Sequence, residues 1–104
     1  MNVRKSVVIS VDFSEAPGGR HPVNGPKSGQ EFRERFLEQN AQSGTPLLID
    51  LDGTYGYSAS FLDEAFGGLA RKFGVEKTLA LLFFKSDERP YLIPLIVDRY
   101  MKGN

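Results

Sequence analysis

The chain has 104 residues, of which 40% are hydrophobic, and it contains no cysteine. A chain of this length supports one hydrophobic core, so we expect a single domain over residues 1–104. The lack of cysteine excludes disulfide frameworks, thiolate metal sites and cysteine nucleophiles, and it favours a cytoplasmic location.

The charges are balanced, with 13 basic and 13 acidic residues. Proteins that bind nucleic acids usually carry a basic surplus, which is absent here. The apolar runs at residues 78–84 and 91–97 are far shorter than the roughly 20 residues that cross a bilayer. We therefore expect a soluble protein that binds neither nucleic acid nor membrane.

The first quarter of the chain predicts a strand and then a loop. Apolar residues alternate with more polar ones over residues 7–13, which is the period of a strand. Prolines and glycines crowd residues 16–29, so we expect a long loop there. Within this loop, residues 20–23 could form a short edge strand.

A helix is expected from Ser28 to Gly44. Ser28 precedes Glu31 by three residues, which is the spacing of a capping box, and Gly44 is typical of a helix end. Phe32 and Phe36 would face inward. On the opposite, solvated face we expect Arg33, Glu34, Arg35 and Glu38.

The middle of the chain predicts a buried strand followed by a second helix. Residues 47–51 are apolar on both alternating faces, which is typical of a central strand covered on both sides. Apolar residues then recur at helical spacing from Phe61 to Phe73. Ser58 or Ser60 could cap the start of this helix, and Gly74 suits its end.

The last third predicts a strand at residues 78–84 and a helix over residues 92–100. Pro90 and Pro94 are tolerable only in or near the first turn of that helix. The whole order is strand, loop, helix, strand, helix, strand, helix. This order predicts a small α/β domain with a mixed, mostly parallel sheet.

A first functional hypothesis comes from Asp50-Leu51-Asp52-Gly53-Thr54. This string resembles the opening signature of the haloacid dehalogenase phosphatases. The resemblance implies that Asp50 attacks phosphorus, that Asp52 transfers the proton and that both flank a magnesium ion. Lys85 would have to supply the lysine of that family. The competing interpretation is that both aspartates cap the turn at the end of the strand.

A second hypothesis concerns the loop from Pro17 to Gly29. The loop is rich in glycine, carries Arg20 and Lys27, and ends at a helix N-terminus, which could bind an anion or a nucleotide. Its glycine spacing matches neither a phosphate-binding loop nor a dinucleotide fingerprint. The competing interpretation is a structural loop.

The segment LLIDLDGTYGYSASFLDEAFGGLAR, residues 47–71, resembles the STAS-like family of unknown function, which is related to bacterial anti-sigma-factor antagonist domains. The matching features are the buried strand ending at Asp50-Leu51, the turn at Gly53 and the helix that opens at Ser60. The helix start near Ser28 also resembles one branch of the family. The resemblance covers about residues 28–75 and includes the phosphatase-like string.

The resemblance implies a non-catalytic bacterial regulatory domain that uses no metal or cofactor. It also implies a protein partner, such as a histidine-kinase-like ATPase. In the antagonists, the partner kinase phosphorylates a serine at the start of this helix. Ala59 takes that position here, so the acceptor hydroxyl is missing. Ser58 and Ser60 flank it and are either modification sites or helix caps.

We expect the partner to bind where the loop after residues 47–51 enters the second helix. Aromatic side chains beside exposed acids are suitable contact material. We call this surface the docking rim, and its candidate residues are Tyr55, Tyr57, Ser58, Ser60, Asp63 and Glu64.

Overall fold

The computed structural model describes residues 3–103 and contains a sheet of three parallel strands in the order β1-β2-β3. The strands are β1 (Ser6–Val8), β2 (Leu47–Asp50) and β3 (Leu82–Lys85). Leu48 lies between Ser6 and Phe83 in the register. The expected α/β class is confirmed, and β2 is the central strand.

Three long helices accompany the sheet, and each contains a π-helical stretch. The first comprises α1 (Gly29–Phe32), η3 (Arg33–Leu37) and α2 (Glu38–Ser43). The second comprises α3 (Ala59–Leu62), η4 (Asp63–Gly67) and α4 (Gly68–Phe73). The C-terminal helix comprises α6 (Leu92–Pro94) and η5 (Leu95–Met101). All three correspond to helices expected from the sequence.

The start and end of the first long helix follow the expected chemistry. The Ser28 hydroxyl accepts a hydrogen bond from the Glu31 amide, and this satisfies one of the free N–H groups of the first turn. Gly44 ends the helix with a φ of 72°, a left-handed conformation that favours glycine.

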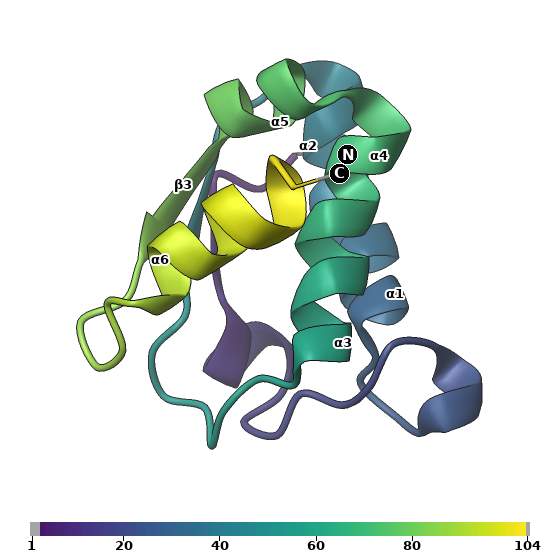
Figure 1. Ribbon diagram of the computed structural model, residues 1–104, viewed down its shortest axis with the longest axis vertical. Helices are drawn as coiled ribbons and strands as arrows, with labels where there is room; N and C mark the ends of the chain where they lie inside the picture. Colours follow the sequence, from purple (N-terminus) through teal and green to yellow (C-terminus); the bar gives the residue numbers. More distant parts are fainter. Residues whose placement is uncertain (1–2, 104) are drawn as a thin grey trace.

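The core lies between the sheet and the long helices. Figure 1 shows β3 at the left border of the molecule and the helices to its right. The sheet contributes Val7, Leu47 and Ile49, each at most 1% exposed. Against them pack aromatic rings from the first two long helices; Phe32 and Phe61, for example, have ring centroids 5.9 Å apart. Burying rings of this size is a dominant source of stability.

The expected strand over residues 7–13 is wrong beyond Val8. The chain turns there into the short π-helical segment η1 (Ile9–Phe13). The Asp12 carboxylate accepts a hydrogen bond from the Val8 amide and so stabilises the turn. Ile9 and Phe13, four residues apart, are buried, whereas Val11 between them is 80% exposed. Over only five residues, an alternating pattern also fits one helical turn.

The expected edge strand at residues 20–23 is also wrong. The segment forms a 3₁₀ turn, η2 (Pro22–Asn24), in which Pro22 occupies the first position. The Asn24 side chain accepts a hydrogen bond from the His21 amide. A proline with its fixed φ and an asparagine that bonds the backbone locally both favour a turn over a strand.

The expected strand at residues 78–84 is half wrong. Residues 75–81 form α5 (Val75–Leu81), and only the following residues enter β3. The Thr78 hydroxyl is buried in this helix and donates to the carbonyls of Gly74 and Val75. A continuous apolar run reads equally as a buried strand or a buried helix.

The expectation that β2 is covered on both faces is wrong as well. Leu47 and Ile49 are buried under the helices, but Leu48 points to the opposite face and is 44% exposed. Its neighbour Phe83 on β3 is 55% exposed. No element among residues 3–103 covers this side of the sheet, which we call the bare face.

No helix within residues 3–103 is long and apolar enough to span a bilayer.

Candidate functional site

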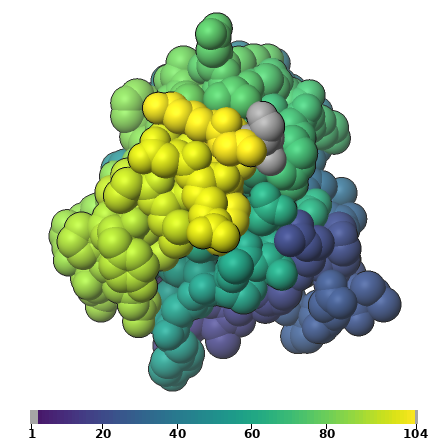
Figure 2. Space-filling model, in the orientation of Figure 1, coloured from purple at the N-terminus to yellow at the C-terminus, as the bar shows by residue number. Residues whose placement is uncertain are grey.

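The loop from residue 51 to residue 58, between β2 and α3, forms the lower tip of the molecule. It descends to the lowest point of the ribbon in Figure 1, and its teal atoms project from the lower edge in Figure 2. It begins with a local turn in which the Asp50 carboxylate accepts a hydrogen bond from the Asp52 amide, 2.9 Å away. Asp50 therefore caps its own turn.

Asp52 connects this loop to the loop that follows β3. One carboxylate oxygen accepts from the Glu88 amide at 3.0 Å, and the other accepts from the Asp87 amide at 3.1 Å and from the Lys85 ammonium at 3.0 Å. The Glu88 amide, followed by the Asp87 amide and Lys85, keeps the pKa of Asp52 below its usual value. Both oxygens are thus committed to structural partners.

Lys85 lies among three carboxylates. Its ammonium is 2.9 Å from Asp87, 3.0 Å from Asp52 and 3.8 Å from Asp50. Its hydrogen bonds to Asp87 and Asp52 raise its pKa, so the cation is retained. Across residues 3–103, no group of three or more His, Cys, Asp or Glu side chains is arranged to hold a metal ion. The ammonium of Lys85 therefore partly neutralises the carboxylates at this end of the sheet.

Tyr55 occupies the tip of the loop and is 81% exposed. Its backbone is nonetheless fixed, because its amide donates to the Glu15 carbonyl at 2.8 Å. Arg89 donates to the carbonyls of Thr54 and Tyr55 from the other side. The loop therefore presents an aromatic ring to solvent on an ordered backbone.

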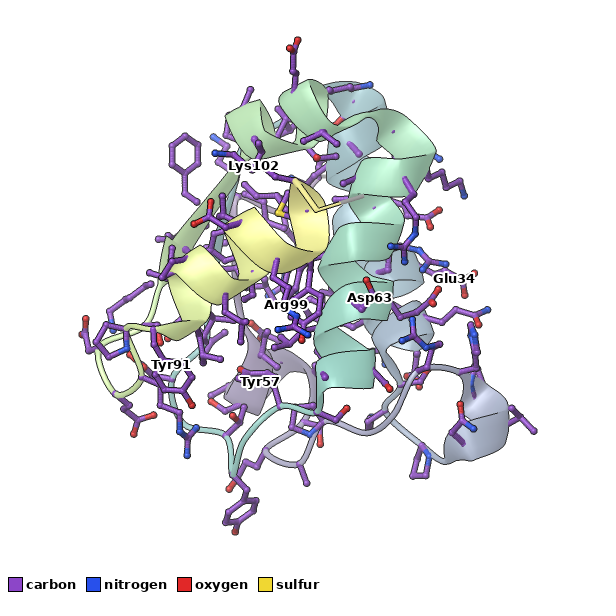
Figure 3. The ribbon with its side chains drawn as sticks, viewed as in Figure 1. Glu34, Tyr57, Asp63, Tyr91, Arg99 and Lys102 are labelled. Carbon is purple, nitrogen blue, oxygen red and sulfur yellow. The ribbon has the colours of Figure 1, made fainter. Side chains whose placement is uncertain are left out.

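Tyr57 has a different environment from Tyr55. It lies within the outline of the fold, beside the start of α3 (Figure 3), and packs against Phe61 with ring centroids 5.8 Å apart. Its hydroxyl donates to the Leu51 carbonyl at 2.8 Å. Burial raises the pKa of Tyr57 to about 12. Tyr57 bonds the end of the loop to its beginning, whereas Tyr55 is the ring available at the surface.

The two serines of the docking rim differ in their bonding. The Ser58 hydroxyl accepts from the Phe61 amide at 3.0 Å and donates to the Gly18 carbonyl at 3.1 Å. Ser58 therefore caps the second long helix. It also attaches to that helix the loop of residues 16–28, which precedes the first long helix and which we call the 16–28 loop. The Ser60 hydroxyl has no hydrogen-bond partner among the residues that the structure describes. Of the two candidate modification sites, Ser60 is the one without a structural bond.

Asp63 and Glu64 are not the exposed acids expected from the sequence. The Asp63 side chain is 25% exposed and pairs with Arg20 at 2.7 Å and Arg71 at 3.1 Å. Glu64 is 14% exposed and pairs with Arg33 and Arg20. The sequence around these two adjacent acids does not show that Arg20 and Arg33, from the loop and the first helix, will pair with them. Both acids attach the loop and the first helix to the second.

The expected solvated face of the first helix is also partly buried. The Arg33 and Glu38 side chains are each 12% exposed and form a hydrogen-bonded pair at 2.8 Å. Lys72 of α4 pairs with Glu38 from the second helix. Burial alone would raise the pKa of Glu38, but the hydrogen bonds from Lys72 and Arg33 lower it. The sequence alone does not predict this network, because two helices that are far apart along the chain supply its residues.

The first three amides of the first long helix are not available to an anion held by the loop of residues 16–28. The Gly29 amide donates to the Gly19 carbonyl at 2.8 Å and the Gln30 amide to the Arg20 carbonyl at 3.1 Å. The next amide, of Glu31, is taken by Ser28. Since the Arg20 side chain is paired as well, this helix start is occupied by the loop itself.

Comparison with known proteins gives one match. The family model described as STAS-like domain of unknown function (DUF4325) matches residues 28–92. The match runs from the cap of the first long helix through β2, the second long helix and β3, and it reaches the first residue of α6. The chain belongs to the STAS-like family. The matched region contains the 51–58 loop after β2 and the loop of residues 86–91 after β3.

Searches of the curated proteins and of the solved structures returned no match. The resemblance noted at residues 28–75 is confirmed by the family match, which extends it to residue 92. In this STAS-like domain the string around Asp50 and Asp52 is the end of the central strand and its turn.

Proposed function

We propose that this STAS-like domain is a non-catalytic regulatory module that binds a protein partner through the docking rim. The observation that carries the proposal is Tyr55, an aromatic side chain 81% exposed on a backbone fixed by Glu15 and Arg89. Exposed aromatic rings are typical anchors of interfaces. A fixed backbone reduces the conformational entropy that binding must overcome.

The arrangement of the rim separates anchoring residues from supporting ones. Tyr55 and Ser60 have groups free to meet a partner, whereas Tyr57 and Ser58 are bonded inward. Asp63 and Glu64 are held by arginines and keep the second helix in place. We infer that the partner contacts the loop tip and the first turn of α3.

The bonding of the acids supports a non-catalytic role. A phosphatase would need Asp50 free to attack phosphorus and Asp52 free to transfer a proton. Asp50 instead accepts the Asp52 amide, and Asp52 accepts two amides and Lys85. Both oxygens of Asp52 are therefore occupied, which makes it poorly suited to transfer a proton, whereas Asp50 uses one oxygen for its turn.

We propose a histidine-kinase-like ATPase as the partner class, since the family resemblance points to bacterial regulation. Ser60 would then be the hydroxyl that the ATPase could phosphorylate. It lies in the first turn of α3, where added negative charge is favourable to the helix dipole.

The test is calorimetric binding of this chain to purified histidine-kinase-like ATPases from the same organism. Tyr55→Ala should weaken binding at least about tenfold, as loss of an interface anchor does. Tyr91→Ala is the matched control, because Tyr91 is a second exposed tyrosine (62%) outside the rim. Equal effects of the two substitutions, or no binding by the wild type, would contradict the proposal.

A further inference from the structure

The bare face of the sheet carries a shallow apolar groove. The groove is lined by Lys5, Thr45, Pro46, Leu48 and Phe83. Its two central residues, Leu48 and Phe83, are adjacent in the register of β2 and β3. At 44% and 55% exposed, both are large hydrophobic side chains open to solvent.

A bare face is unusual for this type of sheet. All-parallel sheets occur almost only with both faces covered, because each strand is normally buried on both sides. Here the helices cover only the face that includes Val7, Leu47 and Ile49. The opposite face thus lacks the layer that a parallel sheet ordinarily has.

We propose that a second copy of this chain covers the bare face and forms a two-fold symmetric dimer. Leu48 and Phe83 of both copies form the apolar centre of the interface. In a two-fold interface the same patch meets itself, so the patch must be self-complementary in shape and charge.

The size of the face suits a dimer. The described chain is nearly isometric, with extents of 32, 30 and 30 Å and an accessible surface of 5411 Å². One sixth of this surface, a whole side of the molecule including what surrounds the three strands, is roughly 900 Å², and a standard interface buries about 800 Å² per partner. A short peptide would leave much of this face uncovered.

The charges at the two ends of the face are opposite. At the start of the strands, the Lys5 ammonium has no ion-pair partner within residues 3–103. The carboxyl end of the sheet carries four acids, Asp50, Asp52, Asp87 and Glu88, against two cations, Lys85 and Arg89, so it remains acidic overall. Two sheets stacked with antiparallel strands bring each Lys5 to the acidic end of the other copy. Such rim charges set orientation more than affinity.

This arrangement places the two docking rims at opposite ends of the dimer, because the 51–58 loop follows the carboxyl end of β2. The proposal therefore does not depend on the proposed function, and each can fail alone.

The test is the mass of the full chain in solution, measured by light scattering or sedimentation over a micromolar concentration series. Wild type should reach twice the mass of one chain as the concentration rises. Phe83→Lys and Leu48→Lys should each return it to one chain mass at the same concentrations. Tyr91→Lys is the control, since it adds the same charge at another exposed ring, and it should remain dimeric.

Circular dichroism of each variant checks that the fold is retained, and two independent face variants guard against one that unfolds. Lys5→Glu provides a charge test and should shift the dimer toward monomer. A wild type that stays monomeric at every concentration would assign the bare face to a different protein and overturn the proposal. A dimer that persists in both Phe83→Lys and Leu48→Lys would overturn it as well.

Discussion

The carboxylates of Asp52 and Glu88 join two loops, because each accepts a backbone amide of the other loop. The Asp52 carboxylate accepts from the Glu88 amide at 3.0 Å, and the Glu88 carboxylate accepts from the amide of Gly53 at 2.6 Å. The pattern resembles a capping box, but it joins segments 35 and 36 residues apart. It fixes the loop that carries Tyr55 to the loop that follows β3.

Ser58 should matter for stability and Ser60 should not. Ser58→Ala removes both the cap on the Phe61 amide and the bond to the Gly18 carbonyl. The expected loss is about 1 kcal/mol of unfolding free energy, as for other N-caps. Ser60→Ala should leave the urea unfolding midpoint nearly unchanged. Equal midpoints for both variants would show that Ser58 is not the cap.

These two serines also show how far the sequence could go. The spacing before the apolar stripe predicted a cap at Ser58 or Ser60, and the structure selects Ser58. Ser58 also donates to the Gly18 carbonyl, 40 residues away, a contact that no local pattern includes. Local capping chemistry was therefore predictable, whereas the residue that performs it was not.

Arg33 should be more important than Arg35, although both lie on the first helix. Arg33 is 12% exposed and bonds Glu38 and Glu64, whereas Arg35 is 50% exposed and pairs with Glu31. Arg33→Met leaves two shielded carboxylates without that partner, so we expect a loss of about 2 kcal/mol or more. Arg35→Met should cost less than about 0.5 kcal/mol. Urea unfolding of the two variants compares them directly, and a smaller loss for Arg33→Met would contradict the network.

The same network makes the fold sensitive to acid. Although burial opposes it, bonding to arginine and lysine lowers the pKa of Glu38, Asp63 and Glu64 from values of 4.5, 3.8 and 4.5. The folded state therefore binds fewer protons than the unfolded state, and this stability is present above those values. It should decline as pH falls below about 4.5. Thermal unfolding over an acidic pH series should show a shallower decline for Glu64→Gln than for wild type. Parallel curves would contradict this prediction.

Tyr57 should produce an opposite dependence at alkaline pH. Its pKa rises from 10.0 to about 12 in the folded state because it is buried. The folded state therefore keeps a proton that the unfolded state loses, so stability declines between about pH 10 and 12. Tyr57→Phe should reduce that part of the decline and also lose the bond to the Leu51 carbonyl, which contributes about 1 kcal/mol. An unchanged alkaline profile would show that another group causes the decline.

The long helices were predictable because the sequence shows their caps, their apolar stripes and the glycines or prolines near their ends. The wrong strand predictions lie in short apolar runs, which fit a strand and a helical turn equally well. Residues 9–13 turn with Asp12 bonded to the Val8 amide, and residues 75–81 are helical with Thr78 bonded back to Gly74. Burial of Asp63 and Glu64 depends on arginines from other segments. The sequence also carries no sign that one face of β2 would be bare.

The most direct test of the account is phosphate release, because its central claim is that Asp50 and Asp52 brace the 51–58 loop and perform no chemistry. Wild type and Asp50→Asn are incubated with magnesium and a generic aryl phosphate, and free phosphate is measured. We predict no release above the protein-free control for either protein. Magnesium-dependent release by wild type that is lost in Asp50→Asn would contradict the account and make the chain a phosphatase.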